Sequence, residues 1–423
     1  MIESIRLRDF RGIHSGFRDR FRQFNVLVGA NNSGKSTILE ALYLAATTSR
    51  EADCTIRFRE GERKEESYKV KVASPDLLGE HPMRRVWTRH NYAGQQAELA
   101  EWSQGFVHIA LRDQTLPISA LDLFAGERGF AESETQTAAL LALDPPRLKE
   151  AANGLEPVGP LARDLLGAEA EPFVDKRLVF CWQPELSYYY RGSAAWLVQG
   201  TPAVASHTLY FDADSVRQHI PVTFYQRMLS SVPGWTQRIA RSFGHIFELD
   251  KPFVLQFVPI GSERDSLQGS ILPEDRPAIP IDAFGDGARS AFKLLTPLVA
   301  LAANATPAAP GLLLWEEPES YQNPKTLERF LGEVVRLLKG KPIQVFMATH
   351  SLEVVAQMTD MLQNSELEPE EFMLFHFDLK EGELVSSWFD QDHLVTWLEA
   401  GLDPRVWQDF VSPIQFRLRQ EDI

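Results

Sequence analysis

The chain has 423 residues, of which 44% are hydrophobic and 24% charged, a composition typical of a soluble globular protein with room for a large core. No apolar run reaches the length of a membrane span, the N-terminus lacks the apolar core of a signal peptide, and two distant cysteines favour a reducing, cytoplasmic location. The net charge of −15 argues against a protein coated in nucleic acid, although it leaves room for a local basic groove.

The N-terminal part of the sequence predicts a strand, a glycine loop and a helix. Residues 2–10 mix apolar and charged positions, as an edge strand does, and residues 24–28 form a short run typical of a buried strand. Residues 37–46 carry apolar side chains at helical spacing. Further strands, expected to flank the buried strand in an antiparallel arrangement, are residues 55–58, 67–72 and 106–111.

The middle of the chain, residues 115–245, has a less regular pattern. Helices are expected at residues 118–124, 148–153 and 160–166, strands at 178–182 and 207–211, and a helix pair at 223–247, interrupted at Pro233 and Gly234.

Apolar strands then alternate with helices. Strands are expected at residues 253–259, 312–315, 343–348 and 372–377, and helices at 288–303, from Asn323 to before Gly340, and at 393–400. This alternation predicts an α/β fold: a mixed, largely parallel sheet with helices on both faces, an antiparallel β flank and a helical insertion. The expected divisions are two lobes of this α/β fold at residues 1–115 and 246–365, an insertion at 116–245 and a C-terminal extension at 366–423.

Residues 29–36, Gly-Ala-Asn-Asn-Ser-Gly-Lys-Ser, match the phosphate-binding pattern G-x-x-x-x-G-K-[ST]. The preceding strand and following helix direct backbone N–H groups and a helix N-terminus toward an anion. Lys35 is expected to reach the outer phosphates, and the Ser36 hydroxyl to hold Mg²⁺.

Three later stretches narrow the class of nucleotide-binding protein. A buried strand ends at Glu316 and Glu317, so one carboxylate can hold Mg²⁺ and the other can orient or deprotonate water. His350 follows the next strand and can reach the γ-phosphate region. The glycine turn at Gly285 and Gly287 opens an apolar helix, a second anion site that is best explained by the nucleotide of a partner subunit.

Each of these short motifs also fits an ordinary solvated turn or a surface histidine. Their order, at strand and helix ends after a phosphate loop, favours the functional interpretation. Asp390 and Asp392 form an Asp-x-Asp pair that we interpret as a solvated turn.

This order of motifs resembles the ATP-binding-cassette ATPases of the RecF, SMC and OLD type. The resemblance implies a Walker A motif at residues 29–36, a signature motif at 285–288, Walker B with the catalytic glutamate at 312–317, and a switch histidine at His350. It implies ATP and Mg²⁺ as cofactors, with Glu317 and His350 as catalytic residues and Ser36 and Glu316 as metal ligands. The nucleotide-binding residues are expected to be Gly29, Asn31, Asn32, Ser33, Gly34, Lys35, Ser36, Thr37, Gly285, Asp286 and Gly287.

Three departures from the family pattern stand out. Walker B has Glu316 where an aspartate is usual, which predicts slow hydrolysis, and Gly285 replaces the signature serine. The glutamine loop has two weak candidates, Gln183 and Gln218. Too few residues follow His350 for the Toprim nuclease domain of many OLD-type proteins, so the resemblance is strongest to stand-alone ATPases such as those of the PARIS and Septu anti-phage systems.

The leading hypothesis is an ATPase that forms a homodimer or higher homo-oligomer around ATP and controls a separate effector, a nuclease or toxin, in anti-phage defence. The alternatives are a RecF-like repair ATPase that acts on DNA directly and a nucleotide-dependent sensor with negligible turnover.

Overall fold

The computed structural model describes residues 1–10, 12–46, 48–57, 65–73, 76–78, 105–111, 119–123, 178–182, 194–198, 207–249, 251–260, 266–274 and 277–406. Within these ranges no helix is long and apolar enough to cross a bilayer.

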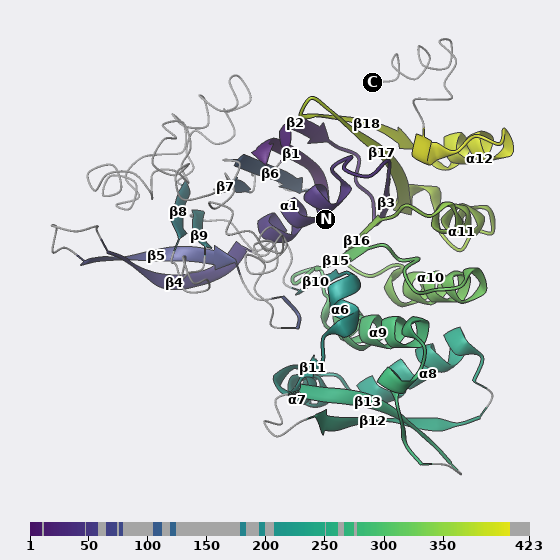
Figure 1. Ribbon diagram of the computed structural model, residues 1–423. Coiled ribbons are helices and arrows are strands. Elements are labelled where there is room, and N and C mark those ends of the chain that lie inside the picture. The colour runs from purple at the N-terminus through teal and green to yellow at the C-terminus, as the bar shows by residue number, and fades with distance from the viewer. Residues whose placement is uncertain are drawn as a thin grey trace.

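A ten-stranded sheet forms the centre of the molecule (Figure 1). In spatial order its strands are β10 (His207–Phe211), β15 (Gly311–Glu316), β16 (Ile343–Ala348), β3 (Phe24–Val28), β17 (Phe372–Lys380), β18 (Glu383–Phe389), β2 (Ile13–Arg18), β1 (Ile2–Phe10), β6 (Gly105–Leu111) and β7 (Ser119–Leu123). The first five strands are parallel, and most pairings beyond β17 are antiparallel, so the predicted mixed α/β sheet is confirmed.

The five parallel strands, β10, β15, β16, β3 and β17, bring the loops that follow them to the same edge of the sheet. Glu316 pairs with Ala348 on β16, and Ala348 pairs with Leu27 on β3, so these three strands end at nearly the same level. Ligands of open α/β sheets bind beyond the carboxyl ends of the strands, and this register places the phosphate loop there.

Helices cover both faces of the five parallel strands and bury most of their residues. Helix α1 (Lys35–Ala46) packs on one face, while α9 (Asp286–Asn304), α10 (Pro324–Leu338), α11 (Leu352–Gln363) and α12 (Gln391–Glu399) lie in a row on the other (Figure 1). On β15, Leu313 and Trp315 join the core beneath the helix row, and the intervening Leu312 and Leu314 are buried on the alternate face. This two-sided burial explains why the strand is apolar without alternation.

A smaller layer packs against α9. It contains α6 (Ala213–Arg217), α7 (Val222–Ser231), α8 (Trp235–Phe247), η3 (Ile281–Ala283) and a four-stranded sheet of β11 (Ile220–Pro221), β13 (Ser266–Pro273), β12 (Phe253–Ile260) and β14 (Ile279–Pro280). Trp235 anchors this layer: its ring stacks on Phe257 at 5.3 Å, and its Nε1–H donates to the Thr296 carbonyl on α9 at 3.0 Å. The layer therefore holds the helix that begins at Gly285.

Most elements expected from the sequence are present with small boundary shifts, including the helix pair α7 and α8 interrupted at Pro233 and Gly234. The helix expected at residues 118–124 is wrong: residues 119–123 form strand β7, because a five-residue segment is too short for its periodicity to distinguish a helix from a strand that pairs with β6. Expected helices at residues 148–153 and 160–166 lie outside the described residues. Asp390 caps α12 by accepting from the His393 N–H at 3.0 Å, as a turn residue does.

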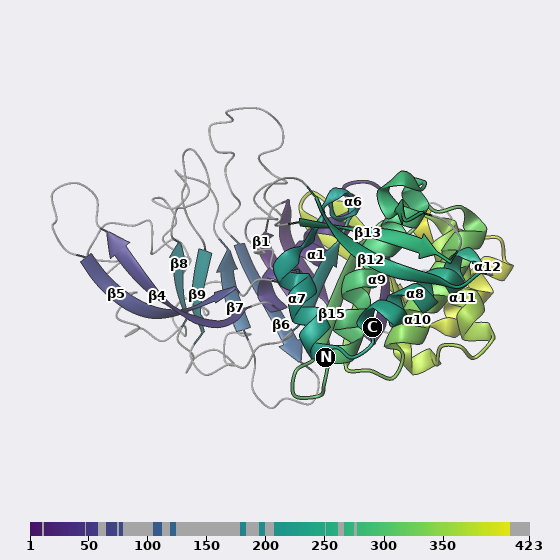
Figure 2. The same ribbon diagram turned by 90° about the horizontal axis from the view of Figure 1, so that it is seen from below.

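Two expectations about strand placement are also wrong. β1 is not an edge strand, since β2 and β6 pair on its two sides. β4 (Thr48–Arg57) and β5 (Glu65–Ala73) do not flank the nucleotide strand. They pair with β9 (Ala194–Val198) and β8 (Leu178–Trp182) in a separate sheet that projects from the main one in both views (Figures 1 and 2). Strand pairing over long sequence separations has no local pattern to predict it.

Candidate nucleotide-binding site

The phosphate loop connects β3 to α1 through two glycines with positive φ. Gly29 has φ 140°, and a Cβ there would lie 2.2 Å from the Phe377 carbonyl oxygen of the neighbouring strand β17. Gly34 has φ 91°. Both positions therefore exclude other residues by backbone conformation, and Gly29 also by space.

Lys35 lies at the start of α1 and is buried inside its own loop. Its Nζ donates to the carbonyl oxygens of Gly29 at 2.9 Å and Ala30 at 2.8 Å, and to Ser33 Oγ at 3.3 Å. Burial lowers the pKa of Lys35 to about 8, while Glu317, Glu316 and Glu319 oppose this shift by favouring the charged amine. The structure thus brings all three carboxylates into the electrostatic surroundings of the phosphate-loop lysine.

The other predicted loop residues differ in exposure. Asn31, Asn32 and Ser36 are exposed, Thr37 is half-buried, and Ser33 is buried where it accepts from Lys35. Asn32 has φ 62°, a left-handed conformation that asparagine tolerates better than most residues. The exposed Ser36 hydroxyl and the first turn of α1 are accessible to a ligand from solvent.

Two carboxylates follow β15 and have different environments. Glu316 is half-buried, and its Oε1 accepts from the Tyr210 hydroxyl of β10 at 2.5 Å. Glu317 is exposed with φ 48°, its N–H donates to the Ala348 carbonyl at 2.8 Å, and its Oε2 accepts from Ser320 Oγ at 3.0 Å. Left-handed non-glycine residues concentrate at functional sites, where the surrounding structure holds them.

Glu319 has a contact role that the sequence analysis did not assign. Its Oε2 accepts from Thr349 Oγ1 at 2.8 Å, and its Oε1 accepts from the His350 N–H at 3.0 Å. This carboxylate joins the loop after β15 to the loop after β16. Its place three residues after Glu316 was visible in the sequence, but its partner could be found only from the adjacency of the two strands.

His350 leads from β16 toward α11 and is exposed. Partial burial lowers the pKa of His350, and the nearby positive charges of Lys35 and Arg405 lower it further, against the opposite effect of Glu317 and Glu319. His350 therefore lies within the electrostatic influence of Lys35, Glu317 and Glu319, and the lowered pKa favours its neutral form.

The turn at Gly285, Asp286 and Gly287 opens α9. Gly285 is the N-cap and has no side-chain capping hydrogen bond, and both Gly285 and Asp286 are exposed. The Gly287 carbonyl accepts from Gln322 Nε2 at 3.0 Å, and a Cβ at Gly287 would lie 2.7 Å from the Tyr321 carbonyl oxygen. The turn is thus packed against the loop that follows the paired carboxylates, with its outer edge open to solvent.

The donors present suit Mg²⁺. Ser36 supplies a hydroxyl and Glu316 a carboxylate, the hard oxygen ligands that this ion prefers. No cluster of three or more metal-binding side chains occurs in the part of the chain that the structure describes. This donor set fits an ion held by few protein ligands together with nucleotide phosphates, which is the usual arrangement for Mg²⁺.

The glutamine-loop candidates remain without support. Gln218 ends α6, and its carbonyl accepts from the buried Lys293 Nζ at 2.7 Å, which is a packing contact of the backbone. Gln183 lies outside the described residues.

Tyr210 is a site residue that the sequence gave no reason to select. We expect Tyr210→Phe to raise the Mg²⁺ concentration needed for half-maximal nucleotide binding about tenfold, because the Glu316 carboxylate loses a charge-assisted hydrogen bond. Mg²⁺ titration of a fluorescent ATP analogue measures this change.

Tyr43 provides the matched control for that substitution. Its ring lies 5.0 Å from the ring of Tyr210, but its hydroxyl donates to Asp76 Oδ2 at 2.9 Å. Tyr43→Phe should leave the Mg²⁺ requirement unchanged. Equal shifts in the two variants would show that ring packing, and not the bond to Glu316, sets the Mg²⁺ dependence.

Comparison with known protein families identifies two matching segments. Residues 1–81 match the family described as "AAA ATPase domain", and residues 206–356 match "AAA domain, putative AbiEii toxin, Type IV TA system". The first segment contains the phosphate loop, and the second contains the turn at Gly285, Glu316, Glu317 and His350.

Two curated proteins are similar over short segments. An "ATP/GTP phosphatase" of Helicobacter pylori is 44% identical over 43 residues, and "Uncharacterized protein MJECL10" of Methanocaldococcus jannaschii is 48% identical over 44 residues. Each match covers 10% of this chain, and the matches cover 12% and 20% of the two relatives.

Among solved structures, an SMC head domain from Thermotoga maritima aligns with 91% of this chain and 98% of its own, at 11% identity and a TM-score of 0.37. An Smc head domain with an extended coiled coil, bound to the C-terminal domain of ScpA derived from Pyrococcus furiosus, aligns with 94% of this chain and 98% of its own, at 13% identity and a TM-score of 0.39. TM-scores below 0.5 do not establish a shared fold, so the identification depends on the two family matches and the loop geometry. Two segments of this chain are therefore similar to AAA-type ATPase domains, and these two segments meet where β3 pairs with β16.

Proposed function

We propose that this protein is an ABC-type ATPase that dimerises around ATP and controls a separately encoded effector, a nuclease or toxin, in bacterial anti-phage defence. The main support for ATPase activity is that Lys35, Glu317 and His350 follow three adjacent parallel strands and lie at their carboxyl ends. A cation for phosphate, a carboxylate for water and a neutral imidazole form a set suited to phosphoryl transfer to water.

In the proposed reaction, Lys35 and the N-terminus of α1 bind the phosphates of ATP. To do so, Lys35 must exchange its bonds to the Gly29 and Ala30 carbonyls for phosphate oxygens. Ser36 and Glu316 would hold Mg²⁺, which neutralises phosphate charge when it is bound.

Glu317 is our candidate general base. Its side chain is exposed and its backbone is fixed in the left-handed conformation, so it can orient a water molecule and accept its proton. Glu319 is unsuited to this role because Thr349 and His350 already occupy both of its oxygens.

Dimerisation is proposed from the turn at Gly285. The exposed N-terminus of α9 carries backbone donors without a side-chain cap, which suits an anion. Since the phosphate loop serves the subunit's own nucleotide, we assign this second anion site to the ATP of a partner subunit. The missing signature serine leaves only backbone groups for that contact.

A role in a two-component system is supported by the description of the second matched family as an AAA domain and putative AbiEii toxin of a type IV toxin–antitoxin system. The acidic net charge of −15 favours a protein partner over extensive DNA contact. The alternative function is a RecF-like ATPase that acts on DNA directly, and a sensor with negligible turnover is the third.

The test measures phosphate release, oligomeric state with and without ATP, and partners captured from the native host. We expect ATP hydrolysis, ATP-dependent dimers, a specific captured protein and no cleavage of plasmid DNA by the purified chain with Mg²⁺ or Mn²⁺. Salt-dependent DNA binding that stimulates hydrolysis would favour the repair function, and ATP binding without phosphate release would favour the sensor. DNA cleavage that persists in Glu317→Gln without a second protein would contradict the separate effector.

A further inference from the structure

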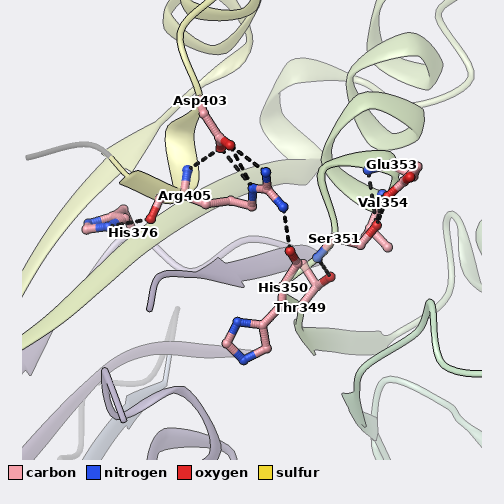
Figure 3. Close-up of polar contacts among 8 residues, drawn as sticks. All are labelled: Thr349, His350, Ser351, Glu353, Val354, His376, Asp403 and Arg405. Atoms are coloured by element: carbon pink, nitrogen blue, oxygen red, sulfur yellow. Dashed lines mark hydrogen bonds and ion pairs between the residues drawn. The ribbon is translucent and has the colours of Figure 1, made fainter. Parts of the chain in front are cut away.

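The backbone of His350 contacts charged side chains from two distant segments. Its N–H donates to Glu319 Oε1 at 3.0 Å. Its carbonyl accepts from Arg405 Nη1 at 2.6 Å (Figure 3). His350 is an exposed residue, so little packing surrounds it. The two contacts tie its backbone to the loop after β15 and to the C-terminal region.

Arg405 is itself firmly oriented. It lies in the short helical turn η5 (Pro404–Val406), and its Nε donates to both oxygens of Asp403 at 2.9 and 3.0 Å, while Nη2 bonds Asp403 Oδ2 at 2.5 Å. This pairing fixes the guanidinium plane and directs Nη1 to the His350 carbonyl (Figure 3). The side chain of Arg405 is 30% exposed, so the contact lies near the surface.

The turn that carries Arg405 is also attached to the phosphate-loop side of the sheet. The Arg405 carbonyl lies 3.1 Å from His376 Nε2 and can only accept, which requires the Nε2–H tautomer of that buried histidine. On β17, His376 pairs with Val28, the last residue of β3 before the phosphate loop. Arg405 thus bridges the strand behind the phosphate loop and the loop that carries His350.

We propose that Arg405 is a positioning residue for His350, and that residues 403–406 act as a brace that holds the histidine toward the γ-phosphate region. This inference builds on the proposed ATPase function. Residues 403–406 lie beyond both matched family segments, so the brace is a feature of this chain's C-terminal region. An effector or partner subunit that displaced the brace would lower turnover without touching the nucleotide.

The test compares Arg405→Ala and Arg405→Lys with the parent protein. We expect kcat for ATP to fall about tenfold in both variants, as for loss of one charge-assisted hydrogen bond, with KM unchanged within about twofold. Lysine keeps the charge but offers a single ammonium, which cannot reproduce the planar fork that joins Asp403 to the His350 carbonyl.

Arg329 provides a matched control. It also joins a backbone carbonyl, that of Ile246 at 3.4 Å, to a carboxylate, that of Glu248. It lies on α10, remote from the loop of His350 in sequence, and Arg329→Ala should leave kcat unchanged.

A double variant distinguishes positioning from a general structural role. If Arg405 acts through His350, adding Arg405→Ala to His350→Ala should cause no further loss of kcat. Losses that multiply would overturn the proposal.

A second measurement does not depend on turnover. Amide hydrogen exchange of residues 350–352 in the nucleotide-free protein should rise in Arg405→Ala and Arg405→Lys and stay unchanged in Arg329→Ala. Unchanged exchange in both Arg405 variants would also overturn the brace. A parent protein that hydrolyses no ATP would instead contradict the proposed function, and the exchange experiment would still decide whether the brace exists.

Discussion

Lys35→Ala is expected to lower ATP affinity about a hundredfold or more, because each charge-assisted hydrogen bond to phosphate contributes about 1.5–3 kcal/mol and the amine makes more than one. In the structure the hydrogen bonds of Nζ go to groups of its own loop, so the substitution breaks none that joins distant elements. The fold should therefore survive, as circular dichroism and the thermal midpoint can show. Titration with a fluorescent ATP analogue measures the affinity.

Lys341→Ala is the matched control for this experiment. Lys341 is a partly buried lysine whose Nζ donates to the Ala302 carbonyl at 2.5 Å, and burial lowers its pKa as it does that of Lys35. It follows α10, away from the phosphate loop, and its removal should leave ATP affinity unchanged. A folded Lys35→Ala protein with the affinity of the parent would disprove the phosphate-loop assignment.

Glu317→Gln is expected to reduce kcat for ATP hydrolysis by about a hundredfold to ten-thousandfold, the usual contribution of a general base, while ATP and Mg²⁺ still bind. Glutamine has the shape of glutamate and can keep the contact with Ser320, so the left-handed backbone at φ 48° should not change. ATP-bound dimers should accumulate. Single-turnover phosphate release and light scattering measure the two effects.

Glu248 offers a control with the same backbone conformation. It is an exposed glutamate with φ 50°, paired with Arg329 and remote from the phosphate loop in sequence. Glu248→Gln should leave kcat unchanged. Hydrolysis at the parent's rate in Glu317→Gln would mean that another group activates the water.

The sequence alone predicted the strands around the site with little error, because β3, β15 and β16 are short, mostly apolar runs bounded by polar residues or by glycine and proline. Residues 24–28 and 343–348 were predicted as strands with the bounds of β3 and β16. The phosphate loop could also be predicted from the sequence, since its glycine spacing reflects a local backbone conformation. Gly29 and Gly34 have the positive φ that the pattern requires.

Pairing over long distances could not be predicted from the sequence. Residues 119–123, within the expected helix at 118–124, form β7, and β4 and β5 lie in a separate sheet, because the local pattern of a short segment does not specify its pairing partner. The domain boundaries and the roles of the site residues remain predictions that the experiments above test.

The sequence by itself therefore determined the phosphate loop, the class of fold and the candidate residues Lys35, Glu317 and His350, each of which lies in a local motif. Only the tertiary structure decided which side chains support them. Tyr210 contacts Glu316 across 106 positions, and Arg405 contacts the His350 carbonyl across 55. These contacts form where separate strands and turns lie together at one edge of the sheet. The spacing of residues within a local motif cannot predict which distant segments lie together there.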